Sequence, residues 1–210
     1  MFINIFEILD IILMTLIVGF LFMSTFKPIR KTTEDIMEKY LKKSSNFDWQ
    51  ALWFAAMVTA PAIILHELGH KITALSFGLT ATFHAACSTA NIASGAGFLD
   101  FYCGLTILSI ILKIVGFGFI FFIPAFVAIG AGATSLQQTL IAFAGPGVNL
   151  LLFLISTIIL KTKKDLNPKT AHFFTLTKSI NLFLFIFNMI PIPGFDGFQV
   201  FSGLWKLIGL

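Results

Sequence analysis

The chain has 210 residues, of which 57% are hydrophobic and only 11% are charged, and its mean hydropathy is +0.93. Because water-soluble domains usually carry about 25% charged residues, this composition excludes an ordinary soluble domain. The formal net charge is only +4. No basic run is interleaved with aromatic residues as in nucleic-acid-binding motifs, so we expect no nucleic-acid partner. The length allows several membrane spans of about 20 apolar residues each.

The first apolar stretch covers residues 5–26 and contains two acidic residues, Glu7 and Asp10. A secretory signal peptide begins with a basic region and ends at a small-residue cleavage site, and this stretch has neither. The sequence therefore predicts a retained N-terminal transmembrane helix. The polar segment 27–49 follows, and Asp48 is placed to cap the next helix.

Three further stretches are apolar and long enough to span a membrane: 50–77, 138–160 and 172–192. The polar link 161–171 separates the last two and carries the turn signal Asn167-Pro168. Six basic residues lie between Lys27 and Lys43, and four more lie between Lys161 and Lys169. We interpret both groups as solvated loops at the ends of spans. The sequence predicts an all-α, multi-pass protein of the cell membrane, with a bundle of about four to six transmembrane helices in the lipid bilayer.

The region between the second and third of these spans is not a simple loop. Residues 78–103 are too weakly apolar to span, and 104–130 are apolar but interrupted by glycines and a proline. Lys113 also interrupts this run. A charge at bilayer depth costs a few kcal/mol or more, so we place Lys113 near an interface, where it divides 104–130 into two shorter pieces. We predict a re-entrant or short β-hairpin segment here, with β-segments around 117–129.

The chain has two cysteines, Cys87 and Cys103. They could pair, but a disulfide framework needs more cysteines than two. We therefore interpret both as apolar packing residues.

The sequence His66-Glu67-Leu68-Gly69-His70 lies within the apolar stretch 50–77. Histidines at positions i and i+4 share one helix face, so both imidazoles can bind one zinc ion. Glu67 follows the first histidine and can act as general base toward the attacking water. Polar helix packing is the alternative, but ionisable residues inside apolar spans are costly and usually functional. The motif therefore predicts one zinc ion per chain, with Glu67 as the catalytic residue.

A catalytic zinc site needs a third protein ligand. The candidates are His84, Asp100, Asp165, His172 and Asp196. Asp165 and His172 lie in or beside the polar link and are typical of solvated span ends. Asp196 belongs to the segment 188–197, whose two prolines and two glycines cannot continue a regular helix. Broken backbone at membrane depth is tolerated only where it is buried in protein or lines a wet cavity, so a carboxylate there can point at a metal.

A third motif, Ala144-Gly145-Pro146-Gly147-Val148-Asn149, lies near the start of the span 138–160. Close helix packing through small residues explains Gly145 and Gly147. The amide of Asn149 needs hydrogen-bond partners in lipid. We expect Asn149 either to hold substrate backbone or to support a metal ligand. The same two roles are expected of three residues in the broken segment: Asn188, Pro191 and Pro193.

Together, HExxH in one transmembrane helix, a GPxxN-like stretch in a second and NxxPxPxxDG in a third resemble the site-2 protease family of intramembrane zinc metalloproteases (peptidase family M50). The resemblance covers about Ala51 to Val200, and the runs HELGHKITALSFG and GFIFFIPAFVAI look most like archaeal members. Gly147 departs from the family, in which a larger apolar residue is common.

The resemblance implies a zinc metalloendopeptidase that cleaves transmembrane protein substrates within or near their membrane segments. It implies specific roles for four residues, the zinc ligands His66, His70 and Asp196 and the catalytic Glu67. We expect residues 1–49 to form an N-terminal transmembrane helix with a polar linker, and residues 50–210 to form the metalloprotease core.

The three motifs can meet only if the region 78–137 returns the chain to the membrane face where that region began. The basic segments then lie on the face opposite the metal. The positive-inside rule makes that basic face cytoplasmic. The family resemblance implies the reverse orientation, with the metal nearer the cytoplasm.

Two other functions could use the same residues. A membrane metal-binding or transport protein would need the histidines and the aspartate but not Glu67. A degenerate protease would only bind membrane partners. The intact Glu67 and the three candidate ligands favour the protease.

Overall fold

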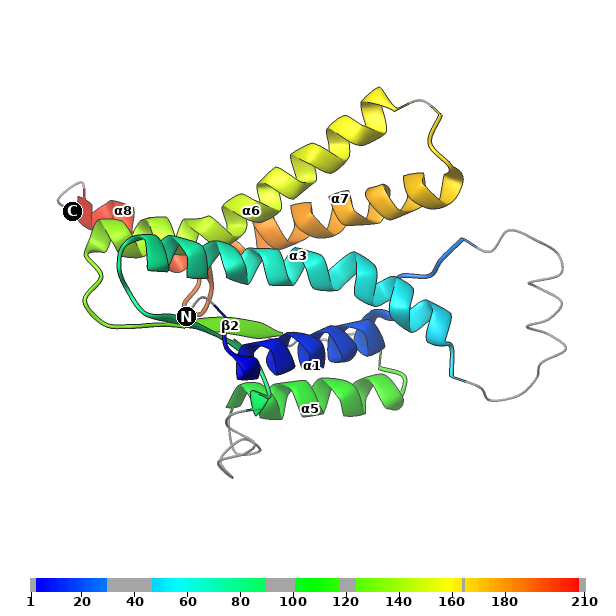
Figure 1. Ribbon diagram of the computed structural model, residues 1–210, viewed down its shortest axis with the longest axis horizontal. Coiled ribbons are helices and arrows are strands. Elements are labelled where there is room, and N and C mark those ends of the chain that lie inside the picture. Colours follow the sequence, from blue (N-terminus) through cyan, green and yellow to red (C-terminus); the bar gives the residue numbers. More distant parts are fainter. Residues whose placement is uncertain (1–2, 30–46, 90–100, 118–123, 164, 208–210) are drawn as a thin grey trace, which may run out of the picture.

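The computed structural model describes residues 3–29, 47–89, 101–117, 124–163 and 165–207. Within these ranges the chain forms six helices and one two-stranded sheet (Figure 1). Four of these helices are long and apolar enough to cross a membrane: α1 (Ile5–Phe22), α3 (Trp49–Ser76), α6 (Ser135–Thr162) and α7 (Pro168–Asn188). The predicted class, a helical membrane protein with a small β segment, is confirmed.

Capping residues set where the spans begin. Asp48 caps α3 as expected, and its carboxylate accepts a hydrogen bond from the backbone N–H of Ala51 at 3.0 Å. Asn167 caps α7 and Pro168 occupies its first turn, so the predicted turn signal is the start of that helix. Thr134 and Gln137 form a capping box that starts α6 slightly before the predicted position.

The region between α3 and α6 contains the sheet. Strand β1 (Ala81–Ala85) pairs antiparallel with β2 (Ala125–Ile129). The predicted β-segment around 117–129 is confirmed for 125–129, and residues 118–123 of it lie outside the described ranges. Along the chain, the short helix α5 (Phe101–Ile114) lies between the two strands. Near its end, the Lys113 amine contacts the Ser24 hydroxyl just beyond α1. The chain therefore reaches the far end of α1 before β2 brings it back, as the convergence of the motifs requires.

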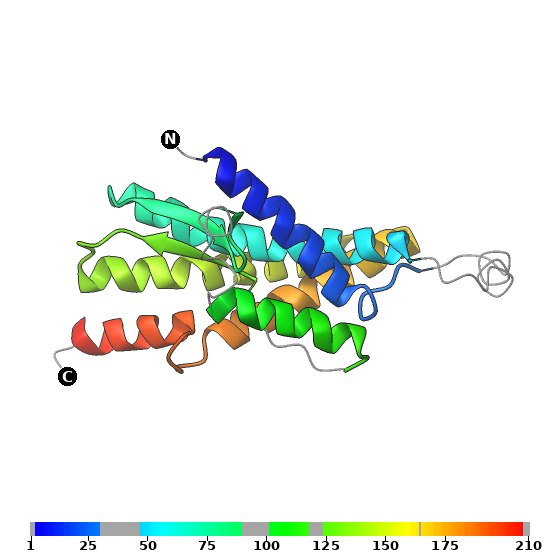
Figure 2. The same ribbon diagram turned by 90° about the horizontal axis from the view of Figure 1, so that it is seen from below.

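A further helix, α8 (Asp196–Leu207), follows the broken segment after α7. It lies beside the N-terminal part of α6 (Figure 2). Its buried residues are Gly197, Val200 and Gly203, which share one face because they are three apart. A side chain at Gly203 would overlap the hydroxyl of Thr139 on α6, so glycine allows this close approach.

Helix α1 is joined to the sheet by its two acidic side chains, which are 3% (Glu7) and 1% (Asp10) exposed. The Glu7 carboxylate accepts hydrogen bonds from the backbone N–H of Phe83 at 2.7 Å and from the Lys71 amine at 2.5 Å. Asp10 accepts from the backbone N–H of Ala85 at 3.1 Å. These bonds satisfy backbone donors of β1 and pair the buried charge of Lys71, which follows the second motif histidine.

Cys87 and Cys103 form a disulfide bond. The interpretation of both as separate packing residues was therefore wrong, although both sulfurs are buried as expected. The bond links the chain just after β1 to the start of α5, across residues 90–100, which lie outside the described ranges. Two cysteines cannot form a framework, but one bond can still hold a short helix against a strand.

Replacing Glu7 with alanine should destabilise the protein by roughly 3–5 kcal/mol, because the buried Lys71 would lose its carboxylate partner. The double variant Glu7→Leu/Lys71→Met removes both charges and should recover most of this loss. Thermal unfolding of the purified protein in detergent measures both effects. A melting temperature of the Glu7→Ala protein equal to that of the wild type would contradict the structural role of this pair.

Candidate metal centre

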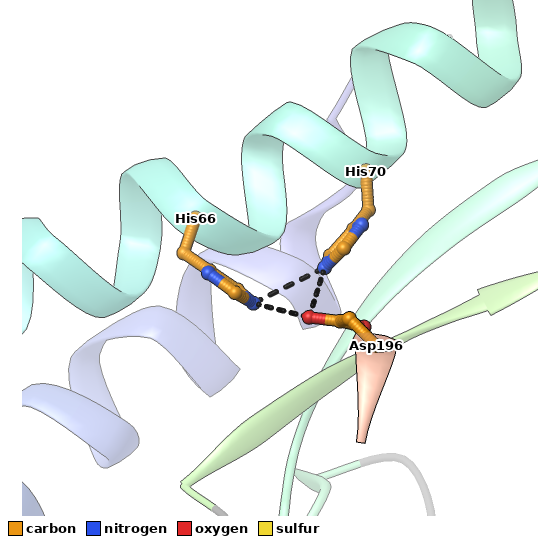
Figure 3. A group of neighbouring side chains, drawn as sticks. All are labelled: His66, His70 and Asp196. Atoms are coloured by element: carbon orange, nitrogen blue, oxygen red, sulfur yellow. Dashed lines mark hydrogen bonds and ion pairs between the residues drawn. The ribbon is translucent and has the colours of Figure 1, made fainter. Parts of the chain in front are cut away.

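Three side chains from two helices converge at one point, as Figure 3 shows. His66 and His70 project from the same face of α3, and Asp196 is the first residue of α8. The Nε2 atoms of the two histidines lie 3.1 Å apart. Oδ2 of Asp196 lies 3.2 Å from Nε2 of His66 and 3.3 Å from Nε2 of His70. The three donor atoms therefore form a nearly equilateral triangle.

The size of this triangle suits zinc. Zinc binds histidine nitrogen and carboxylate oxygen at about 2.0–2.2 Å, usually in a tetrahedron, whose edge is then about 3.3–3.6 Å. The three donor separations of 3.1–3.3 Å lie at or slightly below this edge, so the triangle needs to open only slightly to form one face of the tetrahedron. The fourth corner is left for water or substrate. Two histidines and one carboxylate are also a donor set that catalytic zinc sites use.

The outer nitrogens of both rings are held by acceptors. His66 Nδ1 lies 2.6 Å from Oδ1 of Asn149, and His70 Nδ1 lies 2.7 Å from the carbonyl oxygen of Ile141. A carbonyl only accepts, so His70 carries a proton on Nδ1. The amide of Asn149 is oriented by its own nitrogen, which donates to the carbonyl of Ala62 at 3.1 Å. Its oxygen therefore faces His66, which must also carry a proton on Nδ1.

This arrangement turns two lone pairs and a carboxylate toward one another. With both Nδ1 atoms protonated, a neutral imidazole has a lone pair on Nε2, and these lone pairs face the Asp196 oxygen. Three electron-rich atoms at 3.1–3.3 Å repel one another unless a proton or a metal cation lies between them. A metal cation bound among the three atoms would remove this repulsion.

The broken segment after α7 delivers Asp196 to the site. Helix α7 ends at Asn188, and the chain turns before α8 begins. Gly194 has a φ of +99°, a conformation that only glycine adopts easily. At Gly197 a Cβ atom would overlap the backbone of Met189, so the turn packs against the end of α7. The predicted break is therefore the feature that brings the carboxylate back to α3.

Glu67 lies between the two histidines in sequence and is 8% exposed. It lies close enough to His66, His70 and Asp196 for their charges to act on its carboxyl group, but it is not one of the three converging donors.

The interpretation of Gly145 as ordinary helix packing was incomplete. A Cβ atom built on Gly145 would overlap Nε2 of His70 and lie 2.8 Å from Nε2 of His66. Glycine at this position of α6 therefore leaves room for the donor atoms and for any ion between them. The packing interpretation of Gly147 is not supported, because a Cβ atom there would meet only the ring of Phe143 in the same helix, at 3.4 Å or more.

Asn149 is completely buried, and its nitrogen also donates to Oδ1 of Asn181 at 2.9 Å. Its amide is thus occupied within the protein, which favours support of His66 over contact with substrate. Asn181 is a residue that the sequence analysis missed. It is also completely buried and donates to the carbonyl of Thr177, which fixes its oxygen toward Asn149. Asn181 could have been identified from the sequence in the same way as Asn149, because it is also an amide side chain inside an apolar span.

The remaining candidates are not among the three converging donors. Asn188 donates to the carbonyl of Leu184 in its own helix, and Pro191 and Pro193 are exposed in the broken segment. The other histidines and acids considered as ligands have different surroundings. His84 of β1 lies beside Asp10 of α1, and the ring of His172 bonds the carbonyl oxygen of Lys27. Asp165 is exposed in the loop between α6 and α7, and Asp100 lies outside the described residues.

The Gly145→Ala variant should bind much less zinc than the wild type, because the added methyl group occupies the space between the histidine nitrogens. Gly147→Ala makes the same chemical change one half-turn away and should bind zinc normally. Zinc per chain, measured by elemental analysis after purification, tests both variants. Full zinc occupancy in Gly145→Ala would show that the donor atoms are arranged differently.

The Asn149→Leu variant should lower zinc affinity about 10- to 100-fold, because His66 loses the acceptor that orients its ring. Asn188→Leu, which removes a bond only to its own helix, serves as the matched control and should leave the affinity unchanged. Competition with a chelating dye measures the affinity. Equal affinities of the two variants would argue against a role of Asn149 in holding His66.

Comparisons with known proteins agree with this site. The chain is 32% identical over 171 residues to a protein of Methanocaldococcus jannaschii named "putative zinc metalloprotease", with 79% of each chain covered. It is 28% identical over 162 residues to a Synechocystis protein of the same designation, and this match covers 75% of the present chain but only 34% of the other. No protein-family profile and no solved structure matches the chain. These relatives imply zinc as the cofactor, and the chain belongs to the zinc metalloprotease family of the Methanocaldococcus jannaschii protein.

Proposed function

We propose that the protein is an intramembrane zinc metalloprotease of the site-2 type, resembling archaeal members of peptidase family M50. It hydrolyses peptide bonds within or near the transmembrane segments of other proteins in the cell membrane, through which its own chain passes several times. The observation that carries this proposal is the position of the donor triangle. Two of its members lie on α3, which is itself an apolar span, and the third arrives on a chain break that follows the span α7.

The residues of the chain divide the chemistry among themselves. His66, His70 and Asp196 would hold zinc, which when bound supplies a Lewis acid that polarises the scissile carbonyl and makes water more acidic. Glu67 takes a proton from the attacking water and passes it to the leaving amine. Asn149 and the carbonyl of Ile141 keep the two imidazoles turned toward the site throughout.

Substrate and water must both reach a buried centre. The peptide bonds of a substrate helix are shielded by its own hydrogen bonds, so the segment has to unwind locally before cleavage. The broken segment with Pro191 and Pro193 is exposed and adjoins Asp196, and it is our candidate for the surface that receives unwound substrate and admits water. We assign the metal side to the cytoplasm by the family resemblance, although the basic segments favour the opposite orientation.

A metal transporter remains the alternative that the same ligands would serve. The two functions differ in their need for Glu67, which is not one of the three converging donors. If the protein is a transporter, the Glu67→Gln variant should still move zinc across a vesicle membrane. If it is a protease, neither the wild type nor the variant needs to move zinc.

Replacing Glu67 with glutamine should abolish cleavage of a single-span membrane substrate while zinc content stays near one ion per chain. Glutamine has the size of glutamate but cannot accept the proton from water. Asp165→Asn, which removes an exposed acid in the loop between α6 and α7, is the matched control and should cleave normally. The assay is cleavage in reconstituted vesicles with mass-spectrometric mapping of the cut site. Normal cleavage by Glu67→Gln, or a cut far from the membrane segment, would refute the proposal.

A further inference from the structure

A cavity lies far from the candidate metal centre, between the N-terminal parts of α3 and α7 and the segment that follows α1. Its volume is about 570 Å³, within the range of small-ligand sites. The helices supply most of its lining, including Gln50, Trp53 and Met57 from α3 and Lys169, His172 and Phe173 from α7. Trp53 precedes His66 by 13 residues, about 20 Å along the helix. Figure 1 shows α3 and α7 spreading apart in this direction.

The lining changes from polar to apolar in the same direction on both helices. On α3, Gln50 near the helix start is followed by Trp53 and, one turn further, by Met57. On α7, Lys169 in the first turn is followed by Phe173 one turn later. Both helices are candidate spans, so their first turns lie at the membrane surface and the later turns lie deeper. A ligand that fits this gradient has a polar head at the surface and an apolar chain that extends inward.

The described lining of the cavity carries one formal charge, that of Lys169, and none of the described lining residues is acidic. The ring of His172 bonds the backbone carbonyl oxygen of Lys27 at 3.0 Å, so its ring nitrogen is already occupied within the protein. The Lys169 amine is therefore the cation of the lining that a bound anion would pair with.

We propose that this cavity binds one anionic phospholipid, with the phosphate beside Lys169 and an acyl chain along Trp53, Met57 and Phe173. Basic pockets between transmembrane helices commonly bind lipid headgroups of this charge. Aromatic residues at the membrane interface suit the junction between headgroup and chain. The site is independent of the proteolytic function. Because α3 carries two of the donors and α7 leads to the third, the lipid fills the wedge between the helices that build the metal centre.

Native mass spectrometry of the full-length protein, with phosphatidylglycerol or phosphatidylcholine added to the detergent, tests the proposal. The wild type should retain phosphatidylglycerol in preference to phosphatidylcholine. Lys169→Gln should weaken retention of phosphatidylglycerol about fivefold, the effect of roughly 1 kcal/mol for one lysine at a membrane surface. Lys206→Gln, which removes an exposed lysine on α8, makes the same charge change away from the cavity and should have no effect.

The Met57→Trp variant tests the acyl-chain part of the site independently of the headgroup contact. Met57 is 56% exposed, so the larger side chain can fill the cavity without disturbing the helix packing. This variant should lose bound lipid although every lysine is intact. Equal retention of the two lipids by the wild type, or unchanged retention of phosphatidylglycerol in both Lys169→Gln and Met57→Trp, would overturn the proposal. A lipid-free dimer that Met57→Trp disrupts would also overturn it, because the cavity would then be a contact between two copies of the chain.

Discussion

The candidate metal centre depends on the hydrogen bond between Nδ1 of His66 and Oδ1 of Asn149, which joins α3 to α6. Together with the bond from His70 to the carbonyl oxygen of Ile141, it leaves the Nε2 lone pairs of both rings free to bind a metal ion. The Asn149 amide is itself oriented by Asn181 and by a backbone carbonyl, so the direction of the His66 ring is set by three spans at once. Such a chain of bonds costs little only when every member is satisfied, and a substitution at any link disturbs the metal site.

The rest of the fold can be understood as support for that arrangement. Helix α3 carries two donors, and the close approach of α6 at Gly145 leaves space for them. The turn between α7 and α8 returns Asp196 to the same point. On the other side of α3, Lys71 pairs with Glu7, and Glu7 in turn accepts the backbone N–H of Phe83. Buried charges of this kind are tolerated in an apolar bundle because each has a partner, and they join α1 and the sheet to the helix that carries two of the candidate metal ligands.

Much of this architecture could be predicted from the sequence, and the successes have a common reason. The four spans, the Asp48 cap, the shared face of the two histidines and the chain break before Asp196 depend on local patterns: apolar length, a capping residue, helical spacing and a run of prolines and glycines. The meeting of Asp196 with the HELGH motif was instead implied by the family resemblance. The division of 104–130 followed from a single charge, Lys113. Each of these signals lies within a few residues of the feature that it predicts.

The features that were missed depend on contacts between distant segments. The disulfide requires Cys87 and Cys103 to meet across residues that the sequence does not position. Glu7 and Asp10 were visible only as acids in an apolar helix, because their partners lie more than 60 residues away. Gly145 matched ordinary small-residue packing, and only the position of the histidine rings beneath it shows its second role. Helix α8 has little apolar length of its own and is defined by its packing on α6.

X-ray absorption at the zinc edge of the purified, zinc-loaded protein identifies the atoms that bind the metal. We expect coordination by two imidazole nitrogens and at least one oxygen at about 2.0–2.2 Å, with no sulfur, and a loss of one imidazole in the His66→Ala protein. Sulfur at about 2.3 Å, or a spectrum that the His66→Ala substitution leaves unchanged, would contradict this expectation.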